Sequence, residues 1–174
     1  MRALANAERI QRFMNGLADA ARADGRVYFT GGATAVLFGW RPTTIDVDLR
    51  FAPEQESLLR AIPALKESLE INVELASPVD FIPVRPDWEE RSPFIARIGR
   101  LSFHHFDLYG QALAKVERGH AQDLADVREM VARRLVEPAA ARAYFTAIEP
   151  QLYRYPAVDP VSFRQAVMET FAPE

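Results

Sequence analysis

The stretch Phe29–Phe51, FTGGATAVLFGWRPTTIDVDLRF, decides the fold class of this chain. The β-branched and aromatic residues at 27–30 predict a short buried strand, and a pair of glycines ends it. Residues 33–38 predict a helix that opens directly from the glycines. Apolar and polar side chains alternate over residues 44–51, which predicts a second strand with one buried face and one solvated face.

Periodicity outside this stretch predicts a mixed α+β chain. An amphipathic helix precedes the stretch and ends near Asp24 and Gly25. The elements expected after it are a helix over 53–69 that kinks or restarts at Pro63, a strand over 71–75, a long loop over 77–93, a hairpin of 94–98 with 101–105, and helices over 108–118, 121–136, 139–148 and 160–172. This order indicates a small mixed β-sheet flanked by helices, with a helical C-terminal part. We expect residues 1–107 to form the core and residues 108–174 to form a helical region packed on it.

The composition is that of a globular protein and excludes several functional classes. The 174 residues are 49% hydrophobic, which is enough for a core. With 21 Lys and Arg against 24 Asp and Glu, the formal charge of -3 excludes a strongly basic nucleic-acid coat and a polybasic membrane binder. The sequence has no cysteine, so disulfides, thiolate metal sites and a cysteine nucleophile are excluded. Because we find neither a signal peptide nor an apolar run of about 18 residues, we expect a cytoplasmic protein with no membrane segment.

Two aspartates, Asp46 and Asp48, lie on the solvated face of the second predicted strand. Because side chains alternate along a strand, both carboxylates project from the same face and are close enough to share divalent cations. Two like charges in this position repel each other unless a cation neutralises them. The pair is therefore a candidate site for divalent cations.

The glycine pair, Gly31 and Gly32, predicts a phosphate cradle at the junction of the first strand and the short helix. Without a Cβ atom, the backbone N–H groups at the helix start can approach an anionic phosphate closely. A phosphate cradle beside a metal-holding acid pair is what phosphoryl transfer needs, because two metal ions bridge the attacking and leaving oxygens. Either motif alone is more often structural, but the two together, in this order, favour a functional site.

The same stretch resembles the signature of the polymerase-β-like nucleotidyltransferase superfamily. That signature has a hydrophobic residue, Gly, Gly or Ser, a short helix, Asp-hydrophobic-Asp on the next strand, and a third carboxylate on a later strand. The version found here is similar to the AbiEii/MenT-type nucleotidyltransferase toxins and related uncharacterised bacterial proteins, and the resemblance covers residues 27–82. A second segment, ALAKVERGHAQDLADV at 112–127, resembles the Lys, Arg, Asp and Asp stretch that follows in those toxins.

The resemblance implies roles for the strand and glycine residues. Gly31 and Gly32 would contact the triphosphate, and Asp46 and Asp48 would hold magnesium in a two-metal site. The third carboxylate, a general base or a metal ligand, is either Glu74 or Asp80. Glu74 is favoured because it lies within the strand predicted over 71–75, on the face opposite its apolar residues. Asp80 supplies the residue type that the superfamily more often has, but it follows Ser77 and Pro78, where the strand register is doubtful.

Cationic and polar side chains are also implied at the site. Arg41 and Thr43 precede the acid pair, and Arg41 either braces a phosphate, pairs with an aspartate or forms an ordinary loop salt bridge. By resemblance, Lys115 is a phosphate clamp, followed by Arg118 and Asp123. From periodicity alone, the polar stripe that contains Lys115 is better explained as a solvated helix face with local ion pairs.

The three histidines do not favour a zinc site. His104 and His105 end a predicted strand, and only His120 remains as a further imidazole. We therefore expect His104 and His105 to pack in the hairpin or lie at the surface.

The resemblance implies a metal-dependent enzyme that moves NMP from an NTP to an acceptor hydroxyl and releases pyrophosphate. The implied acceptor is the 3′ end of a tRNA or a protein side chain, and the implied partner is the cognate antitoxin of a toxin–antitoxin pair. The alternative is a catalytically inactive module of the same fold that binds or regulates through a protein partner. The acid pair favours the enzyme, because adjacent carboxylates without a cation are unfavourable.

Overall fold

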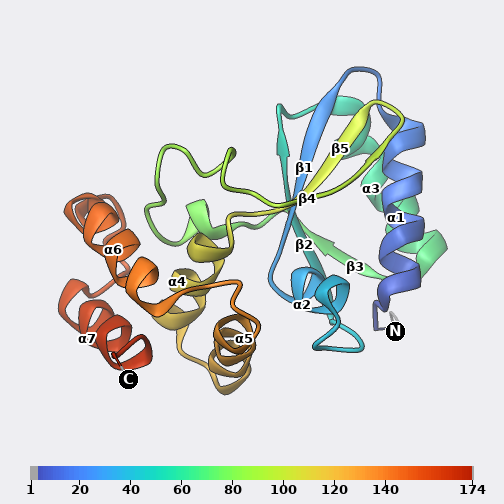
Figure 1. The fold of residues 1–174 in the computed structure, drawn as a ribbon. Helices are drawn as coiled ribbons and strands as arrows, with labels where there is room; N and C mark the ends of the chain where they lie inside the picture. The colour runs from blue at the N-terminus through green and yellow to red at the C-terminus, as the bar shows by residue number, and fades with distance from the viewer. Residues whose placement is uncertain (1–3, 174) are drawn as a thin grey trace. The chain divides into compact units, whose positions relative to one another are not determined.

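Residues 4–173, which the computed structural model describes, form the mixed α+β fold that the sequence predicts. They comprise seven α-helices and a five-stranded mixed sheet with the strand order β3-β2-β1-β5-β4 (Figure 1). The elements are α1 (Ala7–Ala20), β1 (Gly25–Thr30), α2 (Gly32–Phe38), β2 (Asp46–Ala52), α3 (Glu56–Leu69), β3 (Asn72–Glu74), the 3-10 helix η1 (Pro78–Asp80), β4 (Phe94–Ile98), β5 (Leu101–His105), α4 (Leu108–Arg118), α5 (Ala121–Ala132), α6 (Pro138–Ile148), the 3-10 helix η2 (Glu149–Arg154) and α7 (Pro160–Thr170). None of the helices within this range is long and apolar enough to cross a bilayer.

The chain divides into two compact units. The first unit contains the chain up to Ser77 together with Ser92–Phe106, and it carries the sheet and helices α1 to α3. The second unit contains Pro78–Arg91 and the chain from Asp107 onward, and it carries η1 and the C-terminal helices. The structure thus groups residues 78–91 with the C-terminal helices, whereas the sequence analysis counts them with the core. The outer ends of the expected domains, residues 1 and 174, lie outside the described range.

The sheet of the first unit is built around β1. β2 pairs with β1 in antiparallel register and β5 pairs with it in parallel register, while β3 and β4 form the two edges. Val47 and Leu49 of β2 are fully buried and belong to one apolar cluster with residues of α1 and α3. Figure 1 shows both helices on the same side of the sheet. Because side chains alternate, the polar residues of β2 project from the opposite face.

Helix α3 runs without interruption through Pro63, so the prediction of a restart there is wrong. A proline inside a helix lacks the N–H that would bond to the carbonyl four residues earlier. Pro63 lies on the exposed side of the helix, where solvent can satisfy that carbonyl. Leu58, Ile62 and Leu69 keep the other side buried, so packing holds the helix together through the proline.

The long loop before β4 is anchored within the second unit by one buried carboxylate. Asp107 is 1% exposed, and its Oδ2 accepts hydrogen bonds from Tyr144 Oη (2.9 Å) and from Arg91 Nε (3.3 Å). Burial raises the pKa of Asp107, although the hydrogen bond from Tyr144 and the charge of Arg91 oppose the shift. Tyr144 Oη also accepts a hydrogen bond from Arg85 N at 3.1 Å. These contacts explain why the loop belongs with the C-terminal helices.

Candidate functional site

Strand β2 brings Asp46 and Asp48 to one face of the sheet. Val47, between them, is fully buried, and both aspartates are half-buried on the other face. Asp48 lies opposite Thr30 at the end of β1 in antiparallel register. The two carboxylates therefore share a face directly beside the junction of β1 and α2.

Glu74, of the two candidates for the third carboxylate, is the one that pairs with the acid strand. In the parallel register of β2 and β3, Glu74 lies directly beside Asp48, and Val73 lies beside the buried Val47. Glu74 therefore shares the face of Asp48 and is exposed. Asp80 lies in η1, an exposed position of the second unit, and not on β3. The strand register supports Glu74 as the third acid of this face.

The backbone at Gly31 approaches the carboxylate of Asp48. Gly31 has φ 62° and ψ -131°, a conformation that residues with a Cβ atom rarely adopt. A Cβ atom added at Gly31 would lie 3.1 Å from Asp48 Oδ2. Glycine is needed here both for the backbone turn and for the space beside the aspartate.

We expect Gly31→Ala to destabilise the protein by about 1–3 kcal/mol, the usual cost of such strain, and also to displace the Asp48 carboxylate. The matched control is Gly39→Ala, because Gly39 has φ 95° but a Cβ atom there would meet nothing within 4 Å. Denaturant unfolding should show a loss for both variants. If this face binds an NTP with Mg²⁺, as the resemblance implies, only Gly31→Ala should also weaken that binding, and equal binding by the two variants would contradict this role.

At Gly32, the first residue of α2, neighbouring side chains of the protein fill the space that a Cβ atom would need. A Cβ atom there would lie 1.9 Å from Thr44 Oγ1 and 3.4 Å from Arg41 Nη2. Thr44 is buried, and its hydroxyl donates a hydrogen bond to the Asp46 carbonyl at 3.0 Å. The structure thus brings Arg41 beside the glycine pair. Thr43 is half-buried in the loop that leads to β2.

Lys115 and Arg118, the other predicted phosphate contacts, form ion pairs with Asp126 and Asp123 within the second unit. Lys115 is 6% exposed, and its Nζ lies 2.8 Å from Asp126 Oδ2 and 3.8 Å from Asp123 Oδ1. Arg118 donates two hydrogen bonds to Asp123, which also accepts one from the backbone N–H of His120. Burial acts to raise the pKa of Asp123, but the hydrogen bonds and charge of Arg118, with the charge of Lys115, lower it overall. The buried Lys115 and the exposed Arg118 therefore neutralise the two buried carboxylates of Asp126 and Asp123.

His105 is a buried packing residue of the first unit. Its ring stacks on Phe38 with centroids 4.4 Å apart, and its Nδ1 lies 3.0 Å from Thr34 Oγ1 on α2. Burial, and secondarily the charge of His104, lowers the pKa of His105 from 6.5 to about 4. His105 therefore joins β5 to α2 as a neutral ring.

Stability should fall as the pH drops from 6.5 to about 4, because the unfolded chain then takes up a proton that folded His105 refuses. From this pKa difference we expect a loss of about 3 kcal/mol, complete near pH 4. The variant His105→Phe keeps a ring against Phe38 but has no imidazole to titrate. Between pH 6.5 and about 4, the free energy of unfolding of this variant should therefore fall by about 3 kcal/mol less than that of the unmodified chain. Denaturant titrations at several pH values measure this difference, and parallel pH profiles for the two proteins would contradict it.

The carboxylates of β2 and β3 fit magnesium in their chemistry. Hard oxygen donors suit this ion, which is usually held by one or two carboxylates together with substrate phosphates. In the part of the chain that the structure describes, no group of three or more His, Cys, Asp or Glu side chains is arranged to hold a metal by itself. Asp46, Asp48 and Glu74 are among these residues, so they do not by themselves form such a group, and a Mg²⁺ ion on this face would need further ligands such as substrate phosphates.

Asn72 is a residue of this face that the sequence analysis missed. It lies beside Asp46 in the register of β3 and β2, and its Nδ2 donates a hydrogen bond to Asp46 Oδ1. The signal was present in the sequence, because the alternation that places Glu74 on this face places Asn72 on it too.

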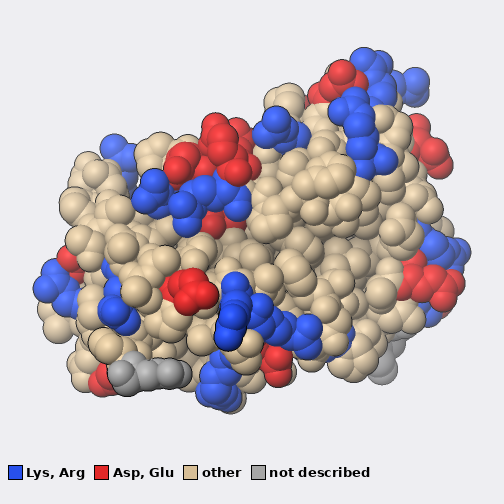
Figure 2. All heavy atoms as spheres, viewed as in Figure 1, with Lys and Arg blue, Asp and Glu red and all other residues tan. Residues whose placement is uncertain are grey.

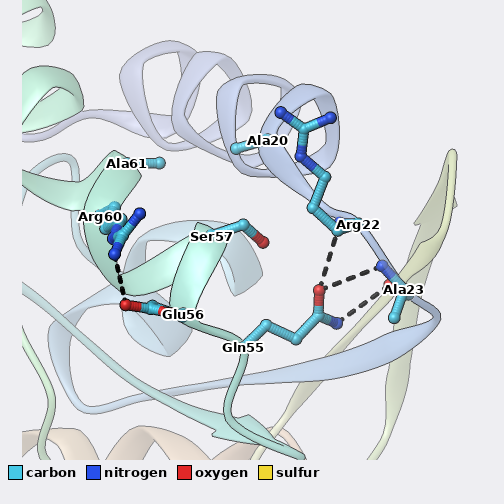
Figure 3. Close-up of a pocket in the computed structure, with 8 residues that line it drawn as sticks. All are labelled: Ala20, Arg22, Ala23, Gln55, Glu56, Ser57, Arg60 and Ala61. Atoms are coloured by element: carbon cyan, nitrogen blue, oxygen red, sulfur yellow. Dashed lines mark hydrogen bonds and ion pairs between the residues drawn. The ribbon is translucent and has the colours of Figure 1, made fainter.

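A pocket of about 660 Å³ in the first unit lies away from these residues in the fold, between the end of α1 and the start of α3. Gln55 ties its two sides together: Oε1 accepts hydrogen bonds from the backbone N–H groups of Arg22 and Ala23, and Nε2 donates to the Ala23 carbonyl (Figure 3). Arg60 and Glu56 form an ion pair at its rim. Its described lining contains none of the predicted site residues, so the pocket is separate from the candidate site.

Comparison with protein-family models, with curated proteins and with solved structures gives no match for this chain.

Proposed function

We propose that this protein is a magnesium-dependent nucleotidyltransferase that moves NMP from an NTP to an acceptor hydroxyl. The observation that carries the proposal is the arrangement on one sheet face: Asp46 and Asp48 lie on β2, and Glu74 lies in register beside Asp48. The glycine at position 31 adds support, because the absence of a Cβ atom lets its backbone lie close to the Asp48 carboxylate.

Each residue of this face has a defined task in the transfer. Asp46 and Asp48 hold Mg²⁺, which when bound supplies Lewis acidity at the phosphate oxygens. Glu74 accepts the proton of the acceptor hydroxyl. The hydroxyl oxygen forms a bond to the α-phosphorus of the NTP, the bond from that phosphorus to the bridging oxygen breaks, and pyrophosphate leaves. Arg41, beside Gly32, offers a positive charge to the phosphates.

For the acceptor, the proposal includes two classes: the 3′ end of a tRNA and a hydroxyl side chain of a protein. Binding of a nucleic-acid acceptor would be favoured if the protein had an extended basic surface, because contacts to phosphate groups dominate such binding. On the face shown in Figure 2, however, basic and acidic side chains are interspersed. A cognate antitoxin remains part of the proposal as a protein partner.

Two measurements on the unmodified chain test the proposal. Calorimetric titration with ATP, GTP, CTP and UTP should give binding that requires Mg²⁺. Incubation with α-phosphate-labelled NTP and either total RNA or total protein should then transfer label to one of the two, with release of pyrophosphate. No binding of any NTP at millimolar concentration would overturn the proposal. Mg²⁺-dependent binding without transfer would instead support the inactive module that acts through a partner.

A further inference from the structure

Strand β3 contributes a second polar side chain to the candidate site. Asn72 and Asp46 are cross-strand partners in the parallel register of β3 and β2, one step before the pair Glu74 and Asp48. The amide Nδ2 of Asn72 donates a hydrogen bond to Asp46 Oδ1. The hydroxyl of Thr44, in contrast, donates to the backbone carbonyl of Asp46 and not to its carboxylate.

The chemistry of this pair is directional. An ionised carboxylate only accepts hydrogen bonds, so the amide nitrogen must face it. Because Asn72 binds Oδ1, the hydrogen bond restrains the orientation of the Asp46 carboxylate, and Oδ2 takes no part in it. An amide is also uncharged, so it orients Asp46 without cancelling the negative charge that a cation needs.

We propose that Asn72 is a positioning residue of the magnesium site: it orients Asp46 so that Oδ2 faces the cation. This inference rests on the proposed function. Partners that orient metal ligands in this way typically change metal affinity by about 10–100-fold when they are removed. The effect of Asn72 should therefore appear in the Mg²⁺ dependence of NTP binding and not in the stability of the fold.

The test compares three variants with the unmodified chain by titrating Mg²⁺ at a fixed concentration of the NTP that binds best. Asn72→Leu keeps the approximate size of the side chain and removes the donor, and it should raise the Mg²⁺ concentration for half-maximal NTP binding by about tenfold or more. Asn72→Gln keeps an amide donor and should recover part of this loss. Leu75→Ala, a change at an exposed residue just after β3, is the matched control and should leave the midpoint unchanged.

Thermal unfolding without Mg²⁺ separates positioning from folding, because Asn72 is half-buried on a short edge strand. Asn72→Leu should unfold within a few degrees of the unmodified chain. If its Mg²⁺ midpoint is unchanged while the unmodified chain binds NTP with Mg²⁺, only the role of Asn72 is overturned. If Asn72→Gln raises the Mg²⁺ midpoint as much as Asn72→Leu does, the loss of the amide donor is not the cause of the effect. If the unmodified chain shows no Mg²⁺-dependent binding, the proposed function fails, and this inference fails with it.

Discussion

Replacement of either strand aspartate, by Asp46→Asn or Asp48→Asn, should abolish the part of NTP binding that depends on Mg²⁺. The asparagine side chain has nearly the same shape as aspartate, so the change removes a negative charge without leaving a cavity. A cation stabilises the transferring phosphoryl group by several kcal/mol. The rate of label transfer should therefore fall by about a thousandfold or more in either variant. Calorimetry with and without Mg²⁺, together with the transfer assay, measures both effects.

The control for this prediction is Glu54→Gln, which removes an exposed acid from the loop between β2 and α3. It changes the net charge of the chain by the same amount and should leave NTP binding unaltered. The circular dichroism spectrum should be the same for all variants, because neither aspartate belongs to the apolar core. Unchanged Mg²⁺ dependence in both aspartate variants would remove the acid pair from the proposed site.

Replacement of Lys115 by methionine should destabilise the protein by about 3–5 kcal/mol, the usual cost of breaking a buried ion pair. Lys115 is 6% exposed and lies 2.8 Å from Asp126, which is itself 1% exposed. Methionine fills a similar volume but removes the ammonium group that faces the buried Asp126 carboxylate. Denaturant unfolding at neutral pH measures the loss.

Two further variants show whether the charge of Lys115 causes this loss. Adding Asp126→Asn to Lys115→Met removes the unbalanced negative charge and should recover a large part of the stability. Arg60→Met breaks an exposed ion pair with Glu56, so it should change the stability by only about 0–1 kcal/mol. If Lys115→Met is no more destabilising than Arg60→Met, the buried ion pair of Lys115 and Asp126 does not contribute to the stability of the helical unit.

The prediction about Lys115 shows where a sequence pattern stops being informative. The spacing of Lys115, Arg118 and Asp126 predicts one polar helix face if a single helix runs through Gly119, but α4 ends at Arg118 and α5 begins at Ala121. Periodicity alone favours a solvated stripe with local ion pairs. The ion pairs exist, but Lys115 and its partners Asp123 and Asp126 are buried and not solvated. Burial depends on which helices contact the stripe. In this unit α4 is contacted by α5, α6 and α7, and that packing is not encoded in the spacing of one helix.

The loop before β4 is a second case of this kind. Its prolines predict a stiff irregular segment, but they do not say which part of the protein it joins. That is decided by the buried Asp107, which accepts hydrogen bonds from Arg91 and from Tyr144. These three residues are far apart in the sequence, so no local pattern connects them.

The sequence by itself determined the mixed α+β class, the order of most helices and strands, and the shared face of Asp46 and Asp48. These properties follow from local rules, because strand alternation and helical periodicity act over a few residues. Only the tertiary structure decided that Glu74 and not Asp80 pairs with the acid strand, that Asn72 binds Asp46, and that Thr44 occupies the space beside Gly32. Each of these depends on the register between strands or on the path of a loop. The physical reason is that such contacts join residues distant in sequence, and their geometry is fixed by how the whole core packs.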